Sequence, residues 1–159
     1  MSNLQPSSRR CFVCGVENPS GLRLKFYNCG PGEVTADYTA PEHYQGYPGV
    51  VHGGIVAAML DEAAGRSHMG GDPPRFMYTA RLSISYRKNV PTGQLLRLVG
   101  HAGKSKGRTA MATSEIYDQS GTLLAEAEAV LVDVPVGVIA NTDLDALGWK
   151  VYPDEETSL

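Results

Sequence analysis

The sequence predicts an α+β domain in which a curved antiparallel sheet wraps around one long central helix. Residues 55–64 follow a helical pattern that is apolar on nearly every face, so this helix must be buried. Residues 78–134 alternate apolar and polar side chains with a period of two, as antiparallel strands do. Because strands and helix are segregated along the chain, a sheet curved around the helix is the most economical way to bury it.

Length and composition limit the class of protein further. The 159 residues fit one domain, which we divide into a leader (1–21), a hotdog domain (22–135) and a tail (136–159). A net charge of −3 argues against nucleic acid as a partner, and no apolar run approaches the ~18 residues of a membrane span. Three cysteines and an N-terminus without a signal-peptide core lead us to expect a cytoplasmic protein.

The leader contains a Cys11-x-x-Cys14 motif whose spacing suits zinc. A closed zinc site needs four ligands, and no second pair stands at a ligand-like spacing. We therefore expect no metal and interpret the motif as a tight turn with half-buried thiols.

Two short strands and a loop precede the helix. Residues 22–27 and 33–39 alternate apolar and polar side chains, with a turn over 28–32 between them. Residues 41–49 form a loop, and we interpret His43 within it as solvated rather than catalytic.

The helix opens with two glycines and contains two carboxylates. Gly53 and Gly54 would leave the first amides of the helix open to a ligand oxygen, at the positive end of the helix dipole. Asp61 and Glu62 need an explanation, because an unpaired buried charge is costly. The alternative is that the glycines only permit close packing and that neighbours cap Asp61. Glu62 lies ~100° from Asp61 around the helix, so we predict that it pairs with an arginine or a backbone amide.

Four strands are predicted after the helix, over residues 78–87, 95–101, 108–117 and 123–134. Glycine- and proline-containing turns separate them, and residues 103–108 form a basic turn. One short helical turn is predicted near residues 143–147. Two strands, one buried helix and four meandering strands constitute the hotdog arrangement.

Several stretches also resemble a known family. The run Gly49-Val-Val-His-Gly-Gly54, followed by Asp61, resembles the signature of hotdog-fold acyl-CoA thioesterases of the phenylacetate-pathway (PaaI-like) type. The leader sequence CFVCGVENPSGLRL and the block YRKNVPTG at residues 86–93 are similar to stretches found in many members. The resemblance spans residues 11–134.

The resemblance implies an acyl-CoA thioesterase that needs neither a metal nor an organic cofactor. The amide of Gly53, together with that of Gly54, would polarise the thioester carbonyl and hold the developing oxyanion. Asp61 would activate a water or attack the thioester directly. The supporting roles fall to His52, which holds the start of the helix, Thr79, a small hydroxyl near the acid, and Gln45, which replaces an asparagine that is common in the family.

Helix geometry adds a prediction about assembly. Gly53 and Asp61 are eight residues apart, which is ~12 Å along a helix, whereas reacting groups must approach to ~3 Å. The two cannot serve the same substrate within one chain. We therefore predict a two-fold homodimer with two active sites in its interface, and leave open a dimer of dimers.

Basic residues at strand ends are candidates for binding the phosphates of coenzyme A. These are Arg87, Lys88, Lys104, Lys106, Gly107 and Arg108. The alternative for each is an ordinary solvated hairpin.

Two other functions remain open at this stage. A hotdog dehydratase or hydratase acting on acyl thioesters would pair His52 with an acid, and a non-catalytic acyl-CoA-binding module would bind the ester without releasing thiol. The length or aromatic character of the acyl group does not follow from the sequence.

Overall fold

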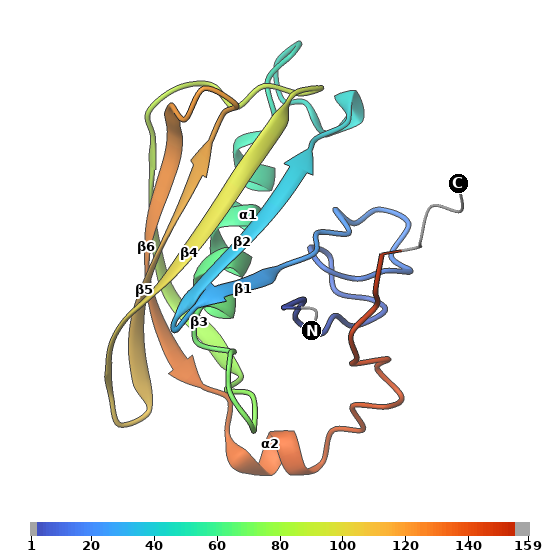
Figure 1. The fold of residues 1–159 in the computed structure, drawn as a ribbon, viewed down its shortest axis with the longest axis vertical. Coiled ribbons are helices and arrows are strands. Elements are labelled where there is room, and N and C mark those ends of the chain that lie inside the picture. Colours follow the sequence, from blue (N-terminus) through green and yellow to red (C-terminus); the bar gives the residue numbers. More distant parts are fainter. Residues whose placement is uncertain (1–2, 155–159) are drawn as a thin grey trace.

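A six-stranded antiparallel sheet curves around the helix α1 (Gly53–Arg66) in the computed structural model, which describes residues 3–154 (Figure 1). The sheet order is β1-β2-β4-β5-β6-β3. The strands are β1 (Tyr27–Gly30), β2 (Glu33–Thr39), β3 (Met77–Tyr86), β4 (Leu95–Lys106), β5 (Thr109–Tyr117) and β6 (Leu123–Asp133). The hotdog arrangement predicted from the sequence is confirmed.

Two short helical segments and the chain ends complete the description. A 3-10 turn, η1 (Glu42–Tyr44), precedes α1, and a short helix, α2 (Val136–Ala140), follows β6. The leader and the chain after α2 gather beyond β1, where Ser7 bridges to Lys150 (Figure 1). Residues 1–2 and 155–159, the outer ends of the predicted leader and tail, lie outside the described residues. None of the helices within 3–154 has the length and the apolar run that a membrane crossing requires.

Helix α1 supplies the centre of the hydrophobic core. Its side chains Val56, Met59, Leu60 and Ala63 are buried against the concave face of the sheet. The strands meet them with Leu96, Leu98, Ile116 and Ala125, and the segment before β1 adds Leu24 and Phe26. The helix is thus enclosed by the sheet on one side and by the leader on another, as its all-round apolar pattern predicts.

The backbone of α1 approaches the sheet unusually closely. A Cβ added to Gly100 of β4 would lie 2.1 Å from the carbonyl oxygen of Ala63. On the neighbouring strand, the buried hydroxyl of Ser114 donates a 2.8 Å hydrogen bond to the carbonyl of Leu60. The sheet therefore fixes the position of α1 through its main chain as well as through its side chains.

The first strand lies later in the chain than predicted. Residues 22–26 do not join the sheet, because the amides of Leu22 and Leu24 donate to the carbonyls of Phe12 and Val13 in the leader. Arg23 also has a positive φ of 56°, which breaks the extended conformation. The alternating pattern in this segment reflects burial under the leader, and the sheet begins only at Tyr27.

The structure corrects one other predicted boundary and adds one helix that was not predicted. Strand β4 continues to Lys106, so the predicted basic turn over 103–108 is mostly strand, and Gly107, with φ of 59°, makes the tight reversal. Helix α2 over Val136–Ala140 was not predicted, whereas the predicted helical turn near residues 143–147 is present and is closed by a hydrogen bond from the Leu147 amide to the Asp143 carbonyl. Pro135 starts α2 directly after the sheet ends.

Replacement of Gly100 by alanine tests the close approach of helix and sheet. The new methyl group must displace the backbone of α1, so we expect Gly100→Ala to lower the free energy of unfolding by about 1–3 kcal/mol. Gly30→Ala, on β1 with open space around its Cβ position, is the matched control and should change little. Urea unfolding measures both, and equal effects would show that the contact between β4 and α1 is not tight.

Candidate active site

His52 caps the N-terminus of α1. Its Nδ1 accepts a 2.9 Å hydrogen bond from the amide of Gly54, and its carbonyl accepts from the amides of Ile55 and Val56. The His52 amide donates to the carbonyl of Tyr44, which ties the helix start to the preceding loop. The amide of Gly54 is therefore already bonded, while that of Gly53 has no acceptor among residues 3–154. Of the two predicted oxyanion donors, only Gly53 has an N–H that no acceptor in the described part of the chain engages.

Tyr86 holds the same helix end from the sheet. Its hydroxyl, at the end of β3, donates a 2.7 Å hydrogen bond to the carbonyl of Gly53. A hollow of about 390 Å³ opens beside this contact and is lined by His52, Gly53, Val56, Tyr86, Arg87 and Lys88, among others. Tyr86 was not predicted as a site residue, although it begins the YRKNVPTG block that carries part of the family resemblance.

Asp61 meets Thr79 on the edge strand of the sheet. The Thr79 hydroxyl donates a 2.6 Å hydrogen bond to Oδ1 of the half-buried Asp61. Strand β3 carries Thr79 and has a register shift between Thr79 and Arg81 where it pairs with β6. The predicted proximity of a small hydroxyl to the acid is present, and the second carboxylate oxygen, Oδ2, has no hydrogen-bond partner among residues 3–154.

Gly53 and Asp61, both on α1, lie beside two different points along β3. Gly53 is bonded to Tyr86 at the end of β3, and Asp61 is bonded to Thr79 near its start. Strand β3 is at the outer edge of the sheet and pairs only with β6 within the described chain. The structure therefore brings both groups to one exposed edge but does not bring them together within a single protomer.

Glu62 faces a different side of the helix. It accepts a 2.8 Å hydrogen bond from Nε of Arg66, one turn further along α1. The guanidinium of Arg66 is buried, lies 5.1 Å from the centre of the Phe26 ring and also donates to the carbonyl of Pro6. The predicted arginine partner of Glu62 is confirmed, and the pair joins α1 to the leader.

Gln45 lies in the loop before α1, directly after η1. Its backbone bridges to Val51, but its side chain is exposed and makes no hydrogen bond to α1 within residues 3–154. Gly46 fills the space next to His52, where an added Cβ would lie 3.2 Å from the His52 Cα. In this conformation the loop contacts the helix start through Tyr44 and Gly46 rather than through the side chain of Gln45.

The predicted basic residues fall into two groups at opposite ends of the sheet. Arg87 and Lys88 follow β3 and adjoin the hollow beside Gly53. Lys104, Lys106, Gly107 and Arg108 lie at the β4–β5 hairpin, whose Arg108 carbonyl bonds to Asp133 opposite the start of β3. Because β3 has ten residues, about 30 Å separate the two groups. One chain cannot hold the phosphates of one coenzyme A with both.

Comparisons with known proteins find similar sequences and structures. Residues 48–125 match the family model described as the thioesterase superfamily. The acyl-coenzyme A thioesterase THEM4 of Rattus norvegicus is 28% identical over 130 residues, which are 80% of this chain and 55% of that protein. The Mus musculus protein of the same name is 29% identical with the same coverage. The chain thus spans about half the length of these curated relatives.

Solved structures share the fold. The crystal structure of a thioesterase superfamily protein aligns with a TM-score of 0.72 and 30% identity, and the alignment covers 78% of this chain and 63% of that one. The PaaI protein from the phenylacetic acid degradation operon of E. coli aligns with a TM-score of 0.65 and 14% identity, covering 72% of this chain and 81% of that one. The latter likeness concerns the fold alone.

The capping role of His52 can be tested by two substitutions. His52→Ala removes the acceptor of the Gly54 amide and should lower the free energy of unfolding by about 1 kcal/mol. His52→Asn retains a good N-cap acceptor and should restore most of that loss. Chemical denaturation of both variants measures the difference, and equal destabilisation by the two would contradict capping as the function of this side chain.

Proposed function

We propose that this chain, which belongs to the thioesterase superfamily, is an acyl-coenzyme A thioesterase that hydrolyses acyl-CoA to a free acid and coenzyme A. The observation that carries the proposal is the pair of groups on the β3 edge. A helix-start amide that has no acceptor in the described part of the chain and a carboxylate fixed by a threonine are the two elements that thioester hydrolysis needs.

Each site residue has a separate role in this proposal. The Gly53 amide polarises the thioester carbonyl and stabilises the oxyanion, a contribution commonly of about 3 kcal/mol in the transition state. Asp61 acts either as the base for a water or as the nucleophile, and Thr79 orients its carboxylate. His52 and Tyr86 hold the helix start from two sides, so that the Gly53 amide is fixed before the substrate arrives.

The site is completed by a second copy of the chain. Strand β3 presents a ten-residue edge with one side that no strand of residues 3–154 pairs, and such edges readily pair with another strand. An antiparallel pairing with a two-fold axis near Leu82 and Ser83 would place Thr79 of one strand opposite Tyr86 of the other. This pairing would bring Asp61 of one protomer to Gly53 of its partner.

The same pairing would bring the first basic group of one chain close to the second basic group of its partner. The partner's β4–β5 hairpin would then lie at the end of β3 where Arg87 and Lys88 adjoin the hollow. Coenzyme A would be held by Arg87 and Lys88 of one chain and by Lys104, Lys106 and Arg108 of the partner, with Gly107 in the turn between them. Pairing of β3 with its copy therefore accounts for why one chain alone separates these residues.

One contact in the structure bears on the dehydratase alternative, and the cysteines bear on where the protein works. A dehydratase would use the His52 ring for proton transfer, but Nδ1 of that ring already serves as the helix cap. Unpaired Cys11, Cys14 and Cys29 support the further proposal that the protein works in the cytoplasm, since a reducing compartment preserves free thiols. A module that only binds acyl-CoA is distinguished by the first experiment below.

Asp61→Asn tests the chemistry. The amide can neither take up a proton nor attack the thioester, so we expect thiol release from acyl-CoA to fall by at least about 100-fold. Asp72→Asn, in the exposed loop before β3, is the matched control and should retain full turnover. The assay follows free thiol over short, medium, long and aryl esters. No release by the wild type would refute the enzyme, and normal turnover by Asp61→Asn would refute the site.

Subunit complementation tests the shared site. Gly53→Pro removes the amide hydrogen, yet proline is well tolerated at the first position of a helix and His52 has a ψ of 135° that permits it. Gly53→Ala keeps the amide and is the control. Each of Gly53→Pro and Asp61→Asn should be inactive alone. When the two are co-expressed, about half of the dimers are mixed and each mixed dimer contains one intact site of two, so the whole sample should recover about a quarter of the wild-type activity. Absence of recovery would contradict a site built from two chains.

A further inference from the structure

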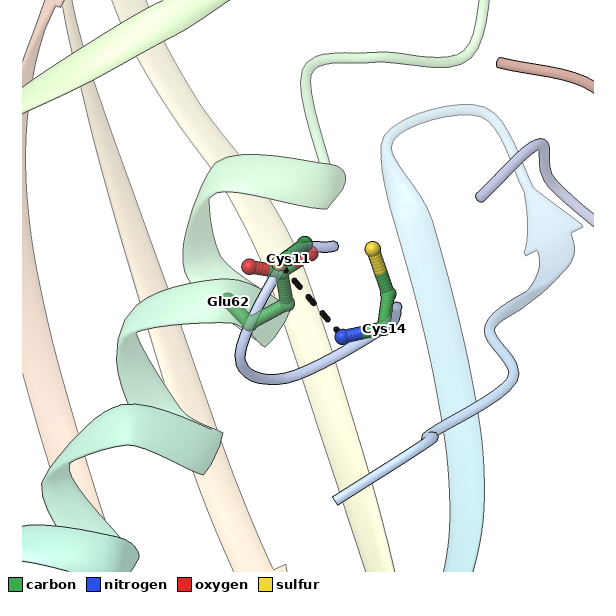
Figure 2. A group of neighbouring side chains, drawn as sticks. All are labelled: Cys11, Cys14 and Glu62. Atoms are coloured by element: carbon green, nitrogen blue, oxygen red, sulfur yellow. Dashed lines mark hydrogen bonds between the residues drawn. The ribbon is translucent and has the colours of Figure 1, made fainter. Parts of the chain in front are cut away.

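The Cys11-x-x-Cys14 turn of the leader folds against α1 at Glu62 (Figure 2). The Gly15 amide donates a 2.8 Å hydrogen bond to the carbonyl of Cys11 and closes the turn. A Cβ on Gly15 would lie 2.3 Å from that same oxygen, so only glycine fits there. The Cys14 amide points at the Sγ of Cys11, 3.5 Å away, which suits a thiolate at this position.

Glu62 contributes a third donor that is distant in sequence from the two cysteines. The two sulfur atoms and a carboxylate oxygen of Glu62 all lie within 4.8 Å of one another. In a tetrahedral zinc site with bonds of about 2.0–2.3 Å, neighbouring donors are slightly less than about 4 Å apart. A small contraction of the three side chains would thus bring them to bonding distance around one ion.

The charges of the cluster also suit a divalent cation. A metal ion binds thiolates, so its binding would release the thiol protons of Cys11 and Cys14. With both thiols ionised, two thiolates and Glu62 carry three negative charges, and the adjacent buried Arg66 supplies one positive charge. A doubly charged ion would neutralise the remainder.

We propose that Cys11, Cys14 and Glu62 bind one soft divalent metal ion of the Zn²⁺ class, with water at the fourth position. Thiolate ligands select zinc over magnesium or calcium, which prefer oxygen donors alone. Because Cys11 is only half-buried, the fourth position can face solvent. The ion would fasten the leader to α1 at the residue next to Asp61.

A dithiol that reacts with oxidants is the competing explanation of a C-x-x-C pair, but it assigns no role to Glu62. A metal site does, and the two explanations predict different responses to substitution of that residue. Glu62→Gln preserves the size of the side chain and an oxygen acceptor for Arg66 while it removes the negative ligand. This variant therefore tests the ligand set without removing a cysteine.

The experiment is a titration of the reduced full-length protein with Co²⁺ and then Zn²⁺. We expect one equivalent of Co²⁺ to give thiolate-to-metal charge-transfer bands in the near ultraviolet and tetrahedral bands in the visible, and Zn²⁺ to displace it. Zn²⁺ should also raise the melting temperature. Cys14→Ser should abolish the bands, Glu62→Gln should weaken binding by at least about tenfold, and Cys29→Ser, which replaces the exposed third cysteine on β1, should bind like the wild type.

Several outcomes would overturn the proposal. Absence of thiolate–cobalt bands in the reduced wild-type protein would refute the site, and unchanged affinity in Glu62→Gln would refute Glu62 as a ligand. Loss of binding in Cys29→Ser would place the metal elsewhere. None of these measurements depends on thioesterase activity, so the metal site and the proposed function can fail independently.

Discussion

The close contact between the backbone of α1 and the sheet is the constraint on which the rest of the structure depends. Gly100 leaves room for the carbonyl of Ala63, and Ser114 bonds to the carbonyl of Leu60. A helix held through its main chain cannot rotate or slide without breaking these contacts. The direction of every side chain that leaves α1 is consequently fixed, and Asp61 and Glu62 are placed by the sheet rather than by their own contacts alone.

The sequence predicted what depends on local periodicity. The apolar pattern of α1 and the alternation in β2, β3, β5 and β6 reflect burial on one or more faces, so these elements were found close to their actual bounds. Residues 22–26 show why the same reasoning fails elsewhere. Their alternation is real, but the leader supplies their hydrogen-bond partners, and the pattern alone does not identify the partner.

The candidate site shows the same limit. The helix-start glycines and Asp61 are recognisable from their spacing, and the contact of Thr79 with Asp61 agrees with the resemblance. The bond from Tyr86 to Gly53 and the meeting of Glu62 with the Cys11–Cys14 turn join segments that are far apart in sequence, so spacing could not reveal them. The capture of the Gly54 amide by His52 depends on a side-chain orientation, which a motif does not encode.

Helix α1 therefore makes three separate sets of contacts. Its start is held by His52 and Tyr86, Asp61 turns toward the open edge of β3, and Glu62 turns toward the leader. Successive helical residues diverge by ~100°, so leader contacts at Glu62 add to the sheet contacts that fix the direction of Asp61. The leader is remote from the β3 edge, yet it acts on the same rigid element. The leader and the proposed active site therefore depend on the position of the same helix.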